Sequence, residues 1–219
     1  MWSIVVAGGS GRRFGEQKQF LSLGGRPVVE WAVTACRPVS AGVVLVVPAK
    51  LWETPRQGAH GADVVVVGGD TRAASVRSGL EAVPDNADVI VVHDAARPLA
   101  PPALFAAVLE ALHEEGVAGA VPGLPPSDTI KVVDPSMNVT NTLDRTSLVA
   151  VQTPQAFRAD ALRNAHSRAR DAVATDDAML VEASGGRVRV VAGHLTNIKI
   201  TTPDDLATAE RLLAAARES

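Results

Sequence analysis

The first stretch that can do chemistry is a glycine-rich segment, residues 7–18, with the sequence AGGSGRRFGEQK. It follows an apolar run at residues 4–6, so we expect a loop directly after a strand. Glycines let backbone N–H groups approach a ligand closely, and Arg13 and Lys18 add two fixed positive charges. Amides and cations together suit a polyphosphate whose departing pyrophosphate must be neutralised.

Two familiar phosphate-binding loops do not explain this segment. A Walker loop requires Gly-Lys followed by Ser or Thr, whereas a glutamine follows Lys18. A dinucleotide fingerprint that begins at Gly9 and Gly11 requires a third glycine where Phe14 stands. An ordinary strand-to-helix turn with surface cations stays open as the alternative.

A second glycine turn, GGDTRAAS, spans residues 68–75. Thr71 is placed to cap the helix that follows, and Asp70 and Ser75 can bond a ribose or a base. Taken alone, this pattern is also that of a plain loop before a capped helix.

A carboxylate, Asp94, follows the apolar run at residues 89–92. At the end of a buried strand it can bind a hard divalent cation, Mg²⁺ or another, that bridges phosphates. His93 points to the opposite face of the strand, and we expect a hydrogen-bonded structural histidine. Arg97 can contact an anion or pair with Asp94, and both interpretations stay open.

Lys199 lies between Ile198 and Ile200, where we expect a strand at residues 198–200. A cation in an apolar strand that faces the ligand edge requires an anionic partner, although a solvent-facing lysine on an edge strand is the alternative. Thr175 can cap a helix that begins with two acidic residues.

The first half of the chain alternates between strand-like and helix-like segments. Strands are expected at residues 4–6, 43–47, 64–67 and 89–93, and helices at 27–36, 51–59, 71–82 and 101–115. The strands are continuous apolar runs, which is typical of a parallel sheet buried on both faces. We therefore predict an α/β three-layer sandwich, Rossmann-like and mostly parallel, in which the two glycine turns and the Asp94 loop meet at one edge.

The second half contains a different pattern. Segments 128–133 and 139–143, joined by a turn at 134–138, predict a protruding β-hairpin arm within residues 125–145 of a single domain, residues 1–219. An isolated hairpin is marginally stable in water, so we expect it to pack on a second subunit. Helices at 159–169 and 176–184, a strand at 187–192 and a final helix from Pro203 complete the prediction.

Composition excludes several classes of protein. A net charge of −3 gives no general affinity for nucleic acid or an anionic membrane. Cys36, the single cysteine, supports neither a disulfide nor a zinc site, and its apolar helical surroundings predict a core residue. No apolar run is long enough to span a bilayer and the N-terminus lacks a signal-peptide pattern, so we expect a cytoplasmic protein.

Eight motifs occur in the order AGGSGRRFGEQKQF, GGDTRAASV, HDAARP, DTIK, DR, TPQ, TDD and NIK, from Ala7 to Lys199. In this order they strongly resemble the 2-C-methyl-D-erythritol 4-phosphate cytidylyltransferase family of the non-mevalonate isoprenoid pathway. The resemblance implies the fold of nucleotide-diphospho-sugar transferases. It also implies attack of the acceptor phosphate on the α-phosphate of CTP, with Mg²⁺, in a homodimer.

The resemblance further implies a role for each matching residue. Arg13 and Lys18 would stabilise the reacting phosphates, and Lys199 and Arg145 would hold the acceptor, with the arm serving the neighbouring subunit. The nucleotide would contact Ala7, Gly8, Gly9, Arg13, Lys18, Gly69, Asp70, Ser75, Asp94 and Ala95. The acceptor would contact Arg97, Thr129, Arg145, Thr153, Thr175 and Lys199, and Asp94 would bind the metal.

Three other functions stay open at this point. A ribitol 5-phosphate cytidylyltransferase shares the CTP loops and differs at the acceptor pocket. A sugar-1-phosphate nucleotidylyltransferase would use UTP or GTP, and a non-catalytic nucleotide sensor would share the fold alone. Because the chain ends soon after Lys199, we expect no fused downstream synthase domain.

Overall fold

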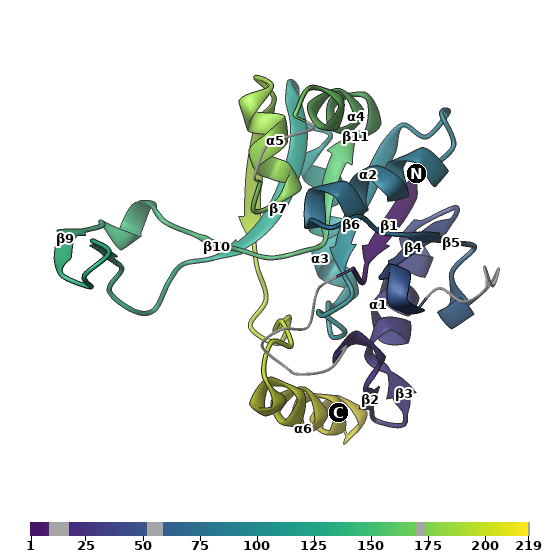
Figure 1. Cartoon of the computed structure of the whole chain (residues 1–219), viewed down its shortest axis with the longest axis horizontal. Coiled ribbons are helices and arrows are strands. Elements are labelled where there is room, and N and C mark those ends of the chain that lie inside the picture. The colour runs from purple at the N-terminus through teal and green to yellow at the C-terminus, as the bar shows by residue number, and fades with distance from the viewer. Residues whose placement is uncertain (9–17, 52–58, 170–173, 219) are drawn as a thin grey trace.

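The computed structural model describes residues 1–8, 18–51, 59–169 and 174–218 (Figure 1). Seven strands of its central sheet follow the order β10-β7-β11-β6-β1-β4-β5, and an eighth, β12, pairs with β7. The bounds of these strands are β1 (Trp2–Val6), β4 (Val43–Val47), β5 (Val64–Val67), β6 (Val89–Asp94), β7 (Val117–Leu124), β10 (Ala150–Val151), β11 (Gln155–Arg158) and β12 (Arg187–Ala192).

Four neighbouring strands, β6, β1, β4 and β5, run parallel to one another, as the uninterrupted valine and isoleucine runs predict. β11 breaks the parallel pattern, because it runs antiparallel to both β6 and β7. β12 is parallel to β7, and β10 is antiparallel to it. The prediction of a mostly parallel α/β sheet is confirmed.

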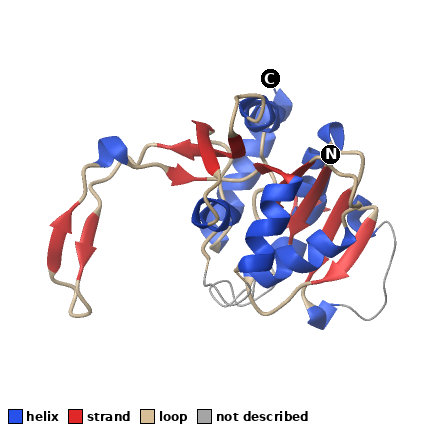
Figure 2. Ribbon diagram, turned by 90° about the horizontal axis from the view of Figure 1, so that it is seen from above, coloured by secondary structure: helices blue, strands red, loops and turns tan. Residues whose placement is uncertain are grey.

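Helices cover both faces of the sheet, which gives the three predicted layers (Figure 2). α1 (Val28–Cys36) and α3 (Pro102–Ala111) pack on one face, and α2 (Arg72–Ala82), α4 (Ala159–Arg168) and α5 (Asp177–Ala183) pack on the other. Cys36 is fully buried in the first of these layers, as predicted for a core residue. Burial raises the pKa of its thiol to about 12.

A third apolar cluster holds α6 (Pro203–Glu218) against β2 (Ser22–Leu23) and α1. Ile200 belongs to this cluster, so the segment that leads from β12 into α6 is tied to the body of the protein. β3 (Arg26–Pro27) pairs with β2. Among the helices that the structure describes, none combines the length and the apolar character that a membrane-spanning helix requires.

The predicted hairpin is present and projects from the body (Figure 1). β8 (Lys131–Val133) pairs antiparallel with β9 (Val139–Thr142). Asp134 closes the turn by accepting hydrogen bonds from the N–H groups of Ser136 and Asn138. The short 3₁₀ helix η5 (Arg145–Ser147) follows on the returning chain.

Several predicted bounds are wrong. Residues 198–200 form no strand, because the backbone bond that joins them to another of the described segments runs from the Ile200 N–H to the Ala96 carbonyl, outside any strand ladder. α3 ends at Ala111 rather than at residue 115, and Asp176, not Thr175, caps α5. Of the helix predicted at residues 51–59, residues 52–58 lie outside the described part of the chain.

The remaining elements are the 3₁₀ helices η1 (Lys18–Phe20), η2 (Arg37–Val39), η3 (Ala49–Leu51) and η4 (Ala59–Gly61).

The start of α6 carries a pH-dependent contribution to stability. Asp205 accepts hydrogen bonds from the Thr201 hydroxyl at 2.6 Å and from the N–H groups of Thr201 and Thr202, both at 2.8 Å. The Thr201 hydroxyl bond is the largest cause that lowers the pKa of Asp205 to about 2. Since this value lies below that of an unfolded aspartate, the stabilisation is complete above about pH 4 and is lost as pH falls toward 2.

We therefore expect Asp205→Asn to cost about 1 kcal/mol or less at pH 7, because the site is largely solvated. The difference from wild type shrinks as pH falls from 5 to 3, and urea unfolding at each pH measures it. The neighbouring Asp204→Asn is the matched control and leaves the pH profile unchanged. A cost for Asp205→Asn that is independent of pH contradicts the assignment.

Candidate active site

The site is centred on Asp94, the last residue of β6. Its carboxylate bonds a cation through each oxygen: Lys199 Nζ donates to Oδ2 at 2.7 Å, and Arg72 Nε donates to Oδ1 at 3.3 Å. Lys199 thus has the anionic partner that its apolar neighbours require, although no strand positions it. Lys199 differs from the alternative of a solvent-facing lysine on an edge strand, because it lies outside any strand and pairs with Asp94, although 42% of its side-chain surface is exposed.

The two cations determine the charge of Asp94. The residue is only 8% exposed, and burial alone raises the pKa of a carboxyl group. The charges of Arg72 and Lys199 outweigh burial and hold the pKa of Asp94 below its ordinary range. Asp94 is therefore ionised at any working pH and offers hard oxygen donors.

Both glycine turns meet beside this centre. A Cβ atom added to Gly8 would lie 2.8 Å from Ser75 Oγ, and one added to Gly68 would lie 2.6 Å from the same atom. Ser75 itself donates a hydrogen bond to the Gly69 carbonyl. The backbone of the two turns therefore approaches Ser75 too closely for a larger residue, and the predicted convergence of these loops is confirmed for the described residues.

Hydrogen bonds join the turns to the strand ends. The Ala7 N–H donates to the Val46 carbonyl at 2.8 Å, and the Ala95 N–H donates to the Val6 carbonyl at 3.0 Å. Gln19, which is buried, donates from Nε2 to the Ala7 carbonyl. These bonds fix the backbone at the start of the first glycine loop and the residue that follows Asp94.

Thr153 supports the same region from the segment before β11. Its buried hydroxyl accepts a hydrogen bond from the Asp94 N–H at 3.0 Å and lies 3.1 Å from His93 Nδ1. The other ring nitrogen of His93 donates to the Arg97 carbonyl at 3.0 Å, so the Thr153 hydroxyl donates to Nδ1. Burial lowers the pKa of His93 to about 4, and the imidazole is neutral. The prediction of a structural histidine is confirmed.

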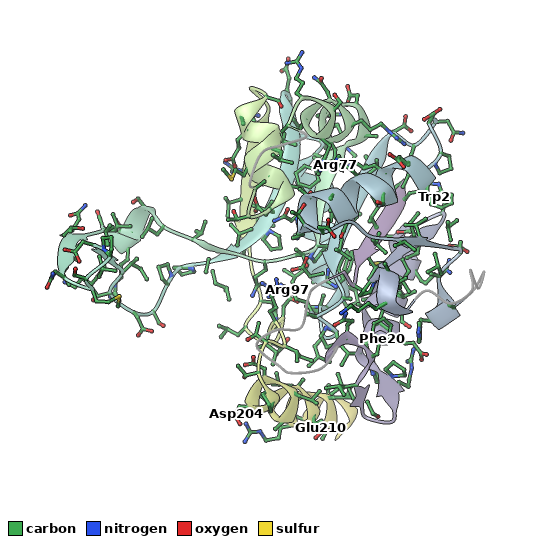
Figure 3. All side chains as sticks on the ribbon, in the orientation of Figure 1. Trp2, Phe20, Arg77, Arg97, Asp204 and Glu210 are labelled. Carbon is green, nitrogen blue, oxygen red and sulfur yellow. The ribbon has the colours of Figure 1, made fainter. Side chains whose placement is uncertain are left out.

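Arg97 binds the segment that carries Lys199. Its Nη1 donates to the Asn197 carbonyl at 2.6 Å, and Asn197 Nδ2 donates to the Thr153 carbonyl at 2.9 Å. Figure 3 shows Arg97 between the central sheet and α6. Within the described part of the chain, the ion pairs of Asp94 are with Arg72 and Lys199, so the predicted Arg97–Asp94 pair does not form.

Arg72 was not predicted as a site residue. It begins α2 directly after the second glycine turn, and it contacts Asp177 as well as Asp94. Its place inside the GGDTRAAS motif is the signal that could have found it, because a cation next to a glycine turn faces the same edge as the turn. Asp177 gave no such signal, since an acidic residue in a first helical turn is ordinary.

Other predicted site residues lie apart from this centre or outside the described residues. Gly9 and Arg13 fall among residues 9–17, which the structure does not describe, and only the backbone of Lys18, at the start of η1, is described. Thr129 and Arg145 are exposed on the arm, which projects away from the sheet edge (Figure 1). Asp70 and Thr175 are exposed, and the Thr175 hydroxyl contacts Met179. Their roles stay predictions.

No protein-made metal cage is present among the described residues, because no three His, Cys, Asp or Glu side chains lie close enough together to hold an ion. Among the described residues, Asp94 offers a buried carboxylate at the edge where the turns meet. Such a site suits a cation that brings most of its ligands with it as phosphate oxygens and water.

Comparison with known proteins agrees with this arrangement. Residues 1–215 match the model of a family described as 2-C-methyl-D-erythritol 4-phosphate cytidylyltransferase. A relative of that name from Rhodococcus jostii is 48% identical over 215 residues, which cover 96% of this chain and 94% of the relative. The chain belongs to the 2-C-methyl-D-erythritol 4-phosphate cytidylyltransferase family.

Solved structures of this family have the same fold. The crystal structure of the cytidylyltransferase from Thermus thermophilus superimposes with a TM-score of 0.81 at 38% identity and covers 96% of this chain and 98% of its own. That of 4-diphosphocytidyl-2C-methyl-D-erythritol synthase from Anaerococcus prevotii has a TM-score of 0.81 at 29% identity, with 97% of each chain covered. The resemblance drawn from the motifs is therefore confirmed.

Some family members are longer. The bifunctional IspD/IspF enzyme of Clavibacter michiganensis is 47% identical over 222 residues, which cover 96% of this chain and 54% of that enzyme. The chain thus spans about half the length of the bifunctional relatives and nearly all of the monofunctional ones. None of these family members bears the name of a ribitol phosphate enzyme or of a sensor.

The hydroxyl of Thr153 generates a test at this site. We expect Thr153→Val to destabilise the protein by about 1–3 kcal/mol, since it leaves the buried Asp94 N–H and His93 Nδ1 without a partner. Thr153→Ser keeps the hydroxyl and is expected to cost less than half as much. Urea unfolding of the three proteins measures the difference. A cost for Thr153→Val that does not exceed the cost of Thr153→Ser, which loses only a methyl group, would show that these hydrogen bonds contribute little to stability.

Proposed function

We propose that this protein transfers a cytidylyl group from CTP to 2-C-methyl-D-erythritol 4-phosphate and releases pyrophosphate. The acceptor's phosphate oxygen forms a bond to the α-phosphorus of CTP, while the bond from that phosphorus to the bridging oxygen of pyrophosphate breaks. The product is 4-diphosphocytidyl-2-C-methyl-D-erythritol. The names of the relatives support this choice of substrates.

The observation that carries the proposal is the ion pair between Lys199 and Asp94 at the edge where the two glycine turns meet. A phosphoryl-type transfer requires cations placed around the reacting phosphates rather than a covalent catalyst. Lys199 is held at this edge yet remains accessible, so its ammonium can move from Asp94 to an arriving phosphate. The ion pair with Asp94 thus holds the Lys199 ammonium at the site before the phosphate arrives.

The remaining roles follow from the positions that match the family. Arg13 and Lys18 would neutralise charge on the α-phosphate and on the departing pyrophosphate. Gly8, Gly69 and Ser75 would line the nucleotide, which fits the close approach of the two turns beside Ser75. Arg97 holds the segment that carries Lys199 through the Asn197 carbonyl, and it would also contact the acceptor, as its match to the family implies.

Mg²⁺ is part of the proposal. The ionised Asp94 carboxylate supplies hard oxygen atoms at the site edge, and the Oδ1 contact to Arg72 is the longer of its two cation contacts. When bound, the ion would supply positive charge that offsets the charge of the reacting phosphates. Asp94 would then be its protein ligand, and the other ligands would come from CTP and water.

A homodimer completes the proposal. The arm exposes Val132, Val133, Met137 and Val139, whose exposed fractions range from 41% to 76%. A two-stranded hairpin with apolar side chains in water is poorly stable on its own, so a second subunit is the simplest partner. Thr129 and Arg145, which lie away from Asp94 in their own chain, would then serve the neighbouring site. A cytoplasmic location suits such an enzyme.

Pyrophosphate release tests the reaction. Purified protein receives CTP and Mg²⁺ with either methylerythritol phosphate or ribitol 5-phosphate, and UTP and GTP replace CTP in parallel. We expect release with CTP and methylerythritol phosphate. Release with ribitol 5-phosphate instead would overturn the acceptor, release with UTP or GTP would overturn the nucleotide, and release with none would favour a sensor.

Lys199 gives a sharper test. We expect Lys199→Ala to lower kcat/KM by roughly 100-fold or more while the protein stays folded, because a cation that stabilises the transition state is lost. Arg211→Ala removes an exposed cation on α6 and serves as the control, with turnover close to wild type. Near-normal turnover of Lys199→Ala would remove Lys199 from the mechanism.

The arm generates a test of assembly. Val139 is 59% exposed on β9, so Val139→Lys is compatible with the folded chain but places a charge in an apolar interface. We expect wild type to be dimeric and Val139→Lys to shift toward monomer, as measured by light scattering after size exclusion. Ala207→Lys on exposed α6 surface adds the same charge and is expected to leave the dimer intact. A dimeric Val139→Lys protein would place the interface elsewhere.

A further inference from the structure

A buried carboxylate lies behind the site and has no role in the transfer proposed above. Asp177, the first residue of α5, is 1% exposed. Its Oδ2 accepts a hydrogen bond from Arg72 Nη1 at 2.6 Å, and its Oδ1 lies 2.9 Å from His166 Nε2. Burial alone raises its pKa, but the Arg72 charge and the His166 hydrogen bond leave the pKa of Asp177 below its ordinary value. An ionised group at this depth is costly, so its partners must compensate for lost hydration.

Arg72 connects this carboxylate to the reaction centre. The guanidinium donates from Nη1 to Asp177 and from Nε to Asp94, so one planar cation bridges two carboxylates. The bond to Asp177 is 2.6 Å long and the bond to Asp94 is 3.3 Å long. Asp177 is therefore the closer anionic partner of Arg72, and Asp94 interacts with the same guanidinium at a greater distance.

Charges alternate along the row Lys199, Asp94, Arg72 and Asp177, two positive and two negative. Removal of the Asp177 charge leaves Arg72 with Asp94 as its remaining anionic partner among these contacts. The guanidinium would then close onto Asp94, whose two oxygens would both be tightly occupied by cations of the protein. A carboxylate held in this way competes poorly for a further cation.

We propose that Asp177 is a positioning residue that keeps Arg72 at the longer distance of 3.3 Å from Asp94 Oδ1, so that this weakly bonded oxygen remains available to the divalent cation that arrives with the nucleotide. His166 belongs to the same arrangement: its ring, 2% exposed, donates from Nε2 and fixes the second oxygen of Asp177. Through Asp177 and His166, the helices α5 and α4 thereby control how available the Asp94 carboxylate on β6 is to a cation. This inference rests on the proposed function, because it assigns the cation of that reaction to Asp94.

Asp177→Asn is the decisive variant, since it keeps the size of the side chain and removes its charge. Calorimetric titration with CTP and Mg²⁺, without any acceptor, measures binding apart from turnover. We expect binding about tenfold weaker than for wild type, and a half-saturating Mg²⁺ concentration for pyrophosphate release about tenfold higher, the range typical for residues that orient a metal ligand.

Asp176→Asn is the matched control. Asp176 precedes Asp177 and caps α5 through Met179 N–H, and it accepts from Gln155, but it does not contact Arg72. Asparagine is an equally good cap, so we expect binding of CTP and the Mg²⁺ requirement to stay within about twofold of wild type.

Arg72→Lys provides a second variant if Asp177→Asn does not fold. It keeps the positive charge, but one ammonium cannot reach both carboxylates. Because Asp177 is the closer partner of residue 72, the ammonium stays with Asp177 and Asp94 Oδ1 loses its contact to a protein cation, so we expect CTP and Mg²⁺ to bind at least as tightly as to wild type. Wild-type binding by folded Asp177→Asn overturns the inference, as does weakened binding by Arg72→Lys or an Asp176→Asn protein that is as weakened as Asp177→Asn. If wild type itself does not bind CTP, the proposed function fails and the inference fails with it; if wild type binds and Asp177→Asn matches it, only the inference fails.

Discussion

Asp94 carries a negative charge in a position that is almost completely buried, and the architecture of the site follows from the need to compensate for it. Removing a carboxylate from water costs several kcal/mol unless cations and donors replace its hydration. Arg72 and Lys199 supply the cations that bond the carboxylate. The Thr153 hydroxyl fixes the backbone of the same residue by accepting a hydrogen bond from the Asp94 N–H. Each of these residues comes from a different segment, so the sheet, α2 and the segment before α6 must all be in place.

Strand composition made much of the fold predictable. β4 and β5 consist of valine and leucine alone, and such runs have few alternatives to a sheet buried on both faces. β11 was not predicted, because Gln155 and Arg158 interrupt the apolar pattern over only four residues. Its glutamine and arginine are justified by tertiary contacts, Gln155 with Asp176 and Arg158 with the Val117 and Leu112 carbonyls, which no local pattern reveals. Residues 198–200 show the opposite case, since Ile198 and Ile200 pack into an apolar cluster while the segment does not join the sheet.

The candidate site was predictable where a charged residue interrupts an apolar run. Lys199 required an anion and Asp94 ended a strand, and the structure pairs these two residues. Arg72, Asp177 and His166 were not predicted, because a cation, an acid and a histidine on helices are usually explained by solvent or by the helix ends. Only the packing of α4 and α5 beside α2 reveals that Asp177 joins Arg72 to the buried His166 through an ion pair and a hydrogen bond. The sequence predicts that Thr153 contacts the acceptor substrate, whereas its hydrogen bonds to Asp94 and His93 could not be inferred from sequence.

The two ion pairs that organise the site also affect how the chain folds. Asp94 is 105 positions before Lys199, and Arg72 is 105 positions before Asp177, so each pair closes a very long loop. Contacts of this kind form late, because the entropy of a long segment is lost before any bond compensates for it. During synthesis the N-terminal strands can assemble first, while Asp94 and Arg72 each wait for a partner that is synthesised 105 positions later. The ionic row therefore forms only when residues from Arg72 to Lys199 have folded together, which makes a working site a marker that this part of the chain is fully folded.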